Sequence, residues 1–249
     1  MNSRASTPRL RVALFITCLG DQFFPQVGEC VVQVLRRLGV EVTFNPAQTC
    51  CGQPAFNTGY RQEARAVAAR VLDQFEDADY VVAPSGSCTS LVRVFYPELF
   101  AGDPERLRKV EKLRSRFLEF SEFLVKVLKV EDVGASFPHR VAYHDSCHLL
   151  RELRIETEPR RLLRAVRGVE LLELKDYQAC CGFGGTFAVK FPGVSVAMAE
   201  DKLRAAAAAG AEYLVASDSS CLMHLAGVIH RQGLPLRTMH LAELLAKQA

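Results

Sequence analysis

The feature that most constrains this chain is an internal duplication marked by its cysteines. Eight of the nine cysteines form two sets with the same order, a single cysteine, a Cys-Cys-Gly triplet and a final cysteine: Cys18, Cys50, Cys51 and Cys88, then Cys147, Cys180, Cys181 and Cys221. Corresponding members are separated by 129, 130 and 133 residues, so only short insertions distinguish the copies. A single repeat of this length indicates a duplicated domain rather than a solenoid of short repeats.

Each half alternates sequence patterns typical of strands and of helices. Apolar or β-branched runs predict strands at residues 10–17, 40–45 and 80–83, and again at 140–144, 169–174 and 213–216. Helical periodicity covers residues 26–38, 61–75 and 89–100, and again 159–166, 194–209 and 222–231. This alternation predicts parallel sheets covered by helices with right-handed crossovers. We therefore expect an α/β fold made of two tandem homologous Rossmann-like half domains with small parallel sheets, related by a pseudo-twofold duplication.

A segment between the two halves has a different pattern. Residues 103–130 have the composition of one long amphipathic helix, basic at its start and apolar toward its end. Residues 134–138, which begin with glycine and end with proline, mark a break. We expect a first half domain at residues 1–102, a connector helix and linker at 103–138, and a second half domain at 139–249.

The eight repeated cysteines all follow predicted strands. Open α/β sheets bind their ligands at the carboxyl ends of the strands, and neighbouring strands lie only about 5 Å apart. Three successive strand ends therefore bring the four cysteines of each half into a small volume. The spacing predicts two sites of four thiolates each.

Four thiolates are ligands for a tetrahedral zinc ion as well as for an iron–sulfur cluster. The adjacent cysteine pairs favour the cluster, because neighbouring side chains on an extended backbone diverge and reach different atoms of a polynuclear centre. Glycines follow both pairs, at Gly52 and at Gly182, Gly184 and Gly185. They allow backbone amides to approach cluster sulfurs closely.

Composition argues against several other functions. A net charge of +3 from 59 mixed charged residues gives no basic surface of the kind that binds nucleic acid. The first ten residues lack the apolar core of a signal peptide, and no apolar run is long enough to span a membrane. Reduced thiols then indicate the cytoplasm. No Gly-x-Gly-x-x-Gly follows a predicted first strand, so we expect no nicotinamide or flavin site.

The paired motifs resemble the cysteine-rich CCG domain family, which includes the glycolate oxidase iron–sulfur subunit and subunits of heterodisulfide reductase and of anaerobic glycerol-3-phosphate dehydrogenase. Within it, three segments resemble most closely the lactate utilization protein A group: Tyr143-His-Asp-Ser-Cys-His-Leu-Leu-Arg-Glu152, Ala179-Cys-Cys-Gly-Phe-Gly-Gly-Thr186 and Ser220-Cys-Leu-Met223. The resemblance covers nearly the whole chain.

This resemblance implies a cytoplasmic electron-transfer subunit of a complex that oxidises L-lactate, or a related 2-hydroxy acid, to the keto acid. The other subunits would include a second iron–sulfur protein and a third protein. The eight repeated cysteines correspond to the family's cluster ligands, and up to two [4Fe-4S] clusters are implied, with zinc an alternative at one site. Two other functions stay open, a zinc-stapled assembly subunit without redox activity and a thiol/disulfide oxidoreductase subunit like heterodisulfide reductase.

The chain departs from the fullest family pattern at two positions. That pattern ends in Cys-x-x-Cys, but Ser85 and Asp218 stand where its first cysteine would be. This argues against a five-cysteine double cluster and against disulfide reduction. We expect Asp218 to be an exposed loop acid rather than an additional oxygen ligand.

Three further residues have alternative interpretations. Cys30 lies on the apolar face of a predicted helix, so we expect a buried and inert thiol rather than a ligand. His144 and His148 flank Cys147 and either donate hydrogen bonds to a cluster or belong to a turn capped by Asp145 or Ser146.

Overall fold

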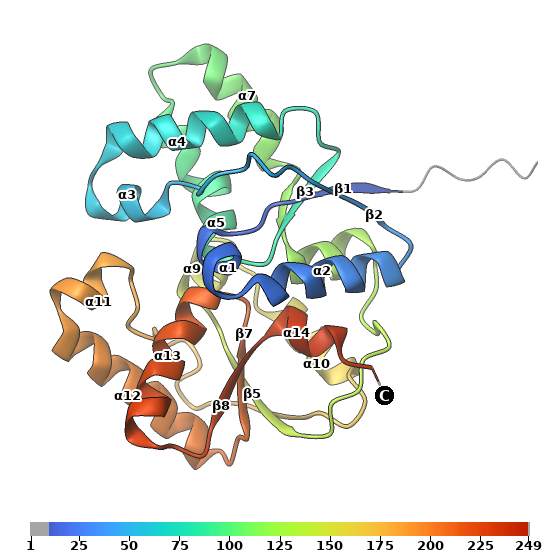
Figure 1. Ribbon diagram of the computed structural model, residues 1–249, viewed down its shortest axis with the longest axis vertical. Coiled ribbons are helices and arrows are strands. Elements are labelled where there is room, and N and C mark those ends of the chain that lie inside the picture. The colour runs from blue at the N-terminus through green and yellow to red at the C-terminus, as the bar shows by residue number, and fades with distance from the viewer. Residues whose placement is uncertain (1–9, 249) are drawn as a thin grey trace, which may run out of the picture.

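The computed structural model describes residues 10–248 and contains two parallel four-stranded sheets of the same topology (Figure 1). The first sheet has the order β2-β1-β3-β4, with β1 (Arg11–Leu14), β2 (Glu41–Phe44), β3 (Tyr80–Ala83) and β4 (Phe117–Glu119). The second has the order β6-β5-β7-β8, with β5 (Arg140–His144), β6 (Glu170–Leu172), β7 (Tyr213–Ala216) and β8 (Arg237–His240). The matching orders confirm the predicted α/β fold with two homologous repeats.

Helices connect the strands in both halves. The longer ones are α2 (Pro25–Arg37), α4 (Arg61–Gln74), α7 (Pro104–Arg114), α10 (Thr157–Ala165), α12 (Pro192–Ala208) and α13 (Ser219–Gln232). Shorter ones are α1 (Cys18–Phe23), α3 (Gln53–Thr58), α5 (Gly86–Ser90), α6 (Tyr96–Leu99), α8 (Phe120–Glu122), α9 (Cys147–Arg151), α11 (Thr186–Lys190) and α14 (Leu241–Ala246), with π-helical turns η1 (Leu91–Phe95) and η2 (Phe123–Val127). Helices α1 and α9 begin at Cys18 and Cys147.

The two sheets share one central core. Side chains alternate across a strand, so Val12 and Leu14 of β1 join a core that also contains residues of the second half, whereas Phe15 joins a core confined to the first half. Helices α2 and α14 pack against each other within the shared core (Figure 1). The halves are therefore packed together through a common apolar interior.

The prediction of one long helix over residues 103–130 is wrong. Helix α7 ends at Arg114, and β4 then pairs in parallel with β3. Phe117 belongs to the core of the first half and Leu118 to the shared core, which is the alternation of a strand rather than the period of a helix. Part of the expected connector thus completes the first sheet, and the boundaries at residues 102 and 139 remain expectations.

The C-terminal end of the second half is held by the first half. Arg37, in the last turn of α2, donates to the carbonyl oxygens of Val133 (2.9 Å), Leu245 (3.3 Å) and Ala246 (3.0 Å). The bonds to Leu245 and Ala246 satisfy carbonyls at the end of α14 that have no partner within the helix.

Between residues 10 and 248, every helix is too short or too polar to cross a bilayer. The expectation that the N-terminus is not a signal peptide concerns mainly residues 1–9, which lie outside the described part.

Candidate metal centre

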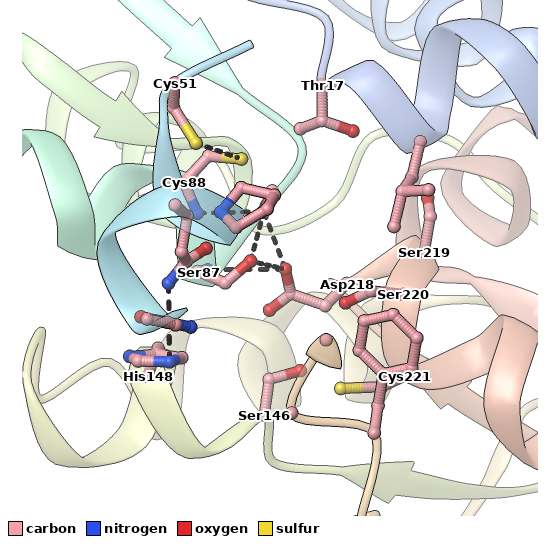
Figure 2. Close-up of a pocket in the computed structure, with 18 of the residues that line it drawn as sticks. Thr17, Cys51, Ser87, Cys88, Ser146, His148, Asp218, Ser219, Ser220 and Cys221 are labelled. Carbon is pink, nitrogen blue, oxygen red and sulfur yellow. Dashed lines mark hydrogen bonds between the residues drawn. The ribbon is translucent and has the colours of Figure 1, made fainter. Parts of the chain in front are cut away.

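All eight repeated cysteines line one cavity of about 260 Å³, which lies at the carboxyl ends of strands from both sheets (Figure 2). The sequence predicts two groups of four, and the structure places both groups around the same space. We call Cys18, Cys50, Cys51 and Cys88 the first group, and Cys147, Cys180, Cys181 and Cys221 the second group. The halves meet closely here, because Gly86 of α5 lies against Leu149 of α9 with no room for a side chain.

The first group forms a continuous chain of sulfur contacts. The Cys51 thiol donates to Cys88 Sγ at 3.3 Å, and the backbone amide of Gly52 donates to Cys50 Sγ at 3.4 Å. Hydrogen bonding with Cys18, and then with Cys51, lowers the pKa of Cys50, while hydrogen bonding with Cys50 raises the pKa of Cys18. The group therefore stabilises a thiolate at Cys50, and a thiolate is the form that binds metal.

The second group repeats this arrangement. The amides of Gly182 and Phe183 donate to Cys180 Sγ (3.4 Å) and Cys181 Sγ (3.5 Å). Hydrogen bonding with Cys147, and then with Cys181, lowers the pKa of Cys180. The contact with Cys181, with a further contribution from the nearby His144, lowers the pKa of Cys221 to about 6 although burial opposes it.

A glycine after each cysteine pair allows the turn to lie against a helix, α4 in the first half and α12 in the second. Gly52 (φ 97°) faces the backbone carbonyl of Ala64 in α4, and Gly182 (φ 88°) faces that of Ser195 in α12. A Cβ at Gly182 would lie 2.4 Å from this carbonyl oxygen. Both the left-handed backbone and the close approach therefore require glycine.

His144 is a buried imidazole whose ring lies beside the sulfurs of Cys181 and Cys221. The residue is 0% exposed, and neither ring nitrogen makes a hydrogen bond to another described residue. One ring nitrogen and the sulfurs of Cys181 and Cys221 all lie within 4.8 Å of one another. An unpaired buried polar group costs about 1–3 kcal/mol, so the surroundings of His144 fit a group bound by the neighbouring sulfurs. The helix-capping alternative is wrong, because no side chain caps α9.

Asp218 is not the exposed loop acid that we expected. It is 2% exposed, and its Oδ1 accepts hydrogen bonds from Ser85 Oγ (2.6 Å) and Ser87 Oγ (2.8 Å) of the first half. Its Oδ2 is buried without a partner among the described residues. Figure 2 shows the carboxylate between Ser87 and the Cys221 side of the cavity. Asp218 therefore joins the two halves at the border between the two cysteine groups.

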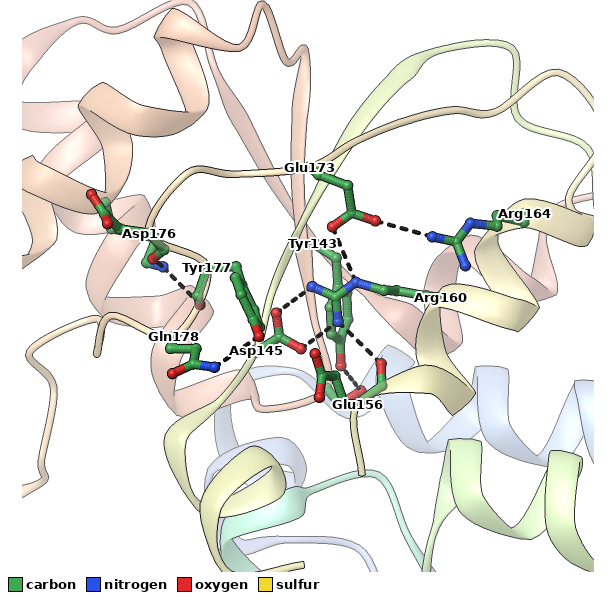
Figure 3. A network of polar contacts seen from close by, with 11 residues as sticks. Tyr143, Asp145, Glu156, Arg160, Arg164, Glu173, Asp176, Tyr177 and Gln178 are labelled. Carbon is green, nitrogen blue, oxygen red and sulfur yellow. Dashed lines mark hydrogen bonds and ion pairs between the residues drawn. The ribbon is translucent and has the colours of Figure 1, made fainter. Parts of the chain in front are cut away.

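A buried ion pair supports the segment before Cys147. Arg160 of α10 donates through two nitrogens to the two oxygens of Asp145, at 2.6 Å each, and through Nε to Glu173 (Figure 3). Such a bidentate contact fixes both position and orientation. Sequence reasoning did not select Arg160, because nothing in the sequence distinguishes it from the exposed Arg161 and Arg164 of the same helix.

The remaining candidates have different positions. Cys30 is half-buried on α2 against the shared core and outside the cavity, and burial raises its pKa. His148 lines the cavity, with Nδ1 3.3 Å from Glu152 and Nε2 3.4 Å from the amide nitrogen of Gln53 in the other half. The donor set of eight thiols thus fits metal binding, and which ligands each group uses stays a prediction.

Known proteins resemble this chain in sequence and in fold. The profile of the cysteine-rich domain family CCG matches residues 12–93 and 141–226. Lactate utilization protein A of an Exiguobacterium species is 48% identical over 94% of this chain and 96% of its own length, and that of Geobacillus thermodenitrificans is 48% identical over 95% and 98%. A hypothetical protein from Helicobacter pylori has the same fold, with a TM-score of 0.69 at 11% identity over 96% of this chain and 49% of that one.

Proposed function

The chain belongs to the cysteine-rich CCG domain family, and on this premise we propose that it is an iron–sulfur subunit that transfers electrons during oxidation of L-lactate, or a related 2-hydroxy acid, to the keto acid. The observation that carries the proposal is the gathering of eight cysteines around one cavity. The names of the relatives, which are similar over nearly their whole length, support the link to lactate.

We infer that each cysteine group holds one cluster, of the [4Fe-4S] type. Such a centre supplies one-electron transfer when bound, with a reduction potential set by charge, by solvent exposure and by hydrogen bonds to sulfur. The chain's own residues supply the thiolates, and the amides of Gly52, Gly182 and Phe183 already donate to three of them. Cys51, Cys88, Cys181 and Cys221 are buried, which keeps water from one side of each group.

Oxidation of a 2-hydroxy acid to the keto acid requires an acceptor for the hydride. No dinucleotide or flavin motif occurs in the sequence, so we infer that partner subunits, including a second iron–sulfur protein, take the hydride and divide the electron pair. All nine cysteines are free in the structure, which is consistent with a reducing compartment such as the cytoplasm.

Metal analysis of protein purified without oxygen tests the proposal. Two clusters correspond to about eight iron atoms and eight sulfides per chain, and the protein should be brown. We expect Cys88→Ser and Cys221→Ser each to lose about half of the iron, because each removes a ligand from one group. Cys30→Ser is the matched control and should retain all of it.

Zinc is the alternative that the same measurement resolves. Four thiolates in each group are also a complete ligand set for structural zinc. Colourless protein with stoichiometric zinc and no iron would replace the electron-transfer function with that of an assembly subunit. Turnover of a disulfide by the isolated chain would instead favour the heterodisulfide reductase-like function.

A further inference from the structure

The duplication allows each residue beside one cysteine group to be compared with its counterpart beside the other. His144 precedes Cys147 by three residues, as Phe15 precedes Cys18. Phe15 is fully buried in the same core cluster as Cys51 and Cys88, and its ring contacts those of Phe75 and Phe117. A polar imidazole therefore lies beside the sulfurs of Cys181 and Cys221 where the corresponding position of the first half holds a buried aromatic hydrocarbon.

The same contrast occurs on the helix behind each cysteine pair. Gly52 lies against Ala64 and Gly182 against Ser195, so corresponding helix positions differ by 131 residues. This offset pairs Val71 of α4 with Lys202 of α12. Val71 is fully buried in the core of the first group, and Lys202 is only 2% exposed. A buried apolar side chain in the first half thus corresponds to a buried ammonium in the second half, whose pKa burial lowers and whose charge interacts with Cys181 and Cys180.

Lys202 of α12 binds the segment that leads to the second cysteine pair. Its Nζ donates to the carbonyl oxygens of Asp176 (2.8 Å) and Tyr177 (3.1 Å). These carbonyls are neutral, so the positive charge is not cancelled by its hydrogen-bond partners. A charge in a poorly solvated interior acts more strongly on its neighbours than the same charge in water.

Other charged residues near the second group do not remove the difference in local charge between the two cysteine groups. Asp145 is paired with Arg160, and the Asp176 side chain is exposed. Asp218 acts in the opposite direction, since its buried carboxylate disfavours the thiolate forms of Cys147 and Cys221. Ser85 and Ser87, however, donate hydrogen bonds to its Oδ1 and offset part of its negative charge. Among the residues from 10 to 248, the buried cations are Arg160 and Lys202, and both belong to the second half.

We propose that the two groups differ in reduction potential and that the second group, beside His144 and Lys202, is the one reduced first. The inference rests on the proposed function. Each reduction adds one electron from an external reductant to one group, and no bond to a substrate forms or breaks. Positive charge and hydrogen-bond donors stabilise the added negative charge, and the first group has apolar side chains in the corresponding places. A single electron delivered to the chain then stays at the second group.

Redox titration of the loaded protein, followed by visible absorption and electron paramagnetic resonance, tests this assignment. We expect two separate transitions in the wild type. His144→Phe and Lys202→Val install the residues of the first half, and each should shift the higher transition to a more negative potential while the lower one stays in place. The double variant should bring the two transitions together. His144→Gln, which retains an N–H donor, should shift the potential of the higher transition less than His144→Phe does.

The controls separate this inference from a general loss of charge or of iron. Arg204→Val removes a cation from the same helix whose side chain is 71% exposed, and both transitions should stay in place. Iron per chain is measured for every variant. If a variant does not bind iron in the second group, Phe15→His tests the inference instead. It should shift the lower transition to a more positive potential.

Two results would overturn the assignment, and they have different consequences for the proposed function. Full iron content with unchanged transitions in His144→Phe and Lys202→Val, or no effect of Phe15→His, refutes the difference between the groups but leaves the iron–sulfur function intact. Wild-type protein without iron refutes the proposed function itself.

Discussion

At the scale of single residues, the buried carboxyl groups differ in how they are stabilised. Asp145 faces the guanidinium of Arg160. Glu119, at the end of β4, has no cation beside it: its Oε2 accepts from the amides of Ser121 (2.8 Å) and Glu122 (3.2 Å) and from the Ser121 hydroxyl, while its Oε1 has no partner among the described residues. Burial raises the pKa of Glu119 to about 8.

This shift makes a prediction about stability and pH. Because the pKa of Glu119 is higher in the folded state than its ordinary value of 4.5, its contribution to stability is fully present below about pH 4.5 and is lost as the pH rises through 8. We expect Glu119→Gln to remove this loss, so that the melting temperature falls less between pH 5 and pH 8 than in the wild type. The difference in unfolding free energy should reach roughly a few kcal/mol at pH 8.

The control is Glu29, whose side chain is exposed to water on α2. Glu29→Gln should leave the pH dependence of the melting temperature as it is in the wild type. Parallel melting curves for Glu119→Gln and the wild type across this pH range would contradict the assignment of a raised pKa to Glu119.

Single residues also show what sequence reasoning could reach. The cysteines were found because thiols repeated at strand ends have few explanations other than shared chemistry. The burial of Asp218 could not be found, because its hydrogen-bond donors are Ser85 and Ser87 of the other half. A loop acid is recognised as buried only when the opposing surface is known.

At the scale of elements, the duplicated strands were predictable and the fourth strand of each sheet was not. Strands β3, β5 and β7 match their predicted ranges because each contains a run of at least three apolar residues with clear ends. β4 has only three residues and β8 contains arginine, threonine and histidine, so neither has a distinct pattern by itself. In β4 the apolar residues also continue into α8 and η2, which made the whole stretch resemble one helix.

The turn after each cysteine pair leads to a prediction about glycine. A Cβ at Gly182 would lie 2.4 Å from the carbonyl oxygen of Ser195, so Gly182→Ala must displace the turn from α12. Gly233→Ala is the matched control, because Gly233 after α13 also has a positive φ (61°) but has open space around it and lies outside the cavity. We expect Gly233→Ala to cost about 1–2 kcal/mol from backbone strain alone. Gly182→Ala should cost more and should lower the iron content by up to half.

Thermal unfolding and iron analysis of the two variants check this expectation. Equal melting temperatures and equal iron content would show that the close approach of the turn to α12 is unimportant for the second group.

At the scale of the whole molecule, the contact between α2 and α14 unites the halves. Arg37 donates to three carbonyl oxygens of the second half and the connecting segment, whereas the neighbouring Arg36 is exposed. We expect Arg37→Ala to free the end of α14 at a cost of about 1–3 kcal/mol. Amide hydrogen exchange of α14 should then accelerate roughly tenfold or more, and Arg36→Ala should leave it unchanged. Equal exchange rates in the two variants would mean that apolar packing alone holds α14 in place.

The Arg37 contact also bears on how the protein is made. Arg37 precedes Leu245 and Ala246, whose carbonyls it binds, by 208 and 209 residues in the chain. The contact between α2 and α14 therefore cannot form until α14 has been synthesised. The core that joins the two halves is thus completed late, and folding of the first half by itself leaves one side of that core uncovered.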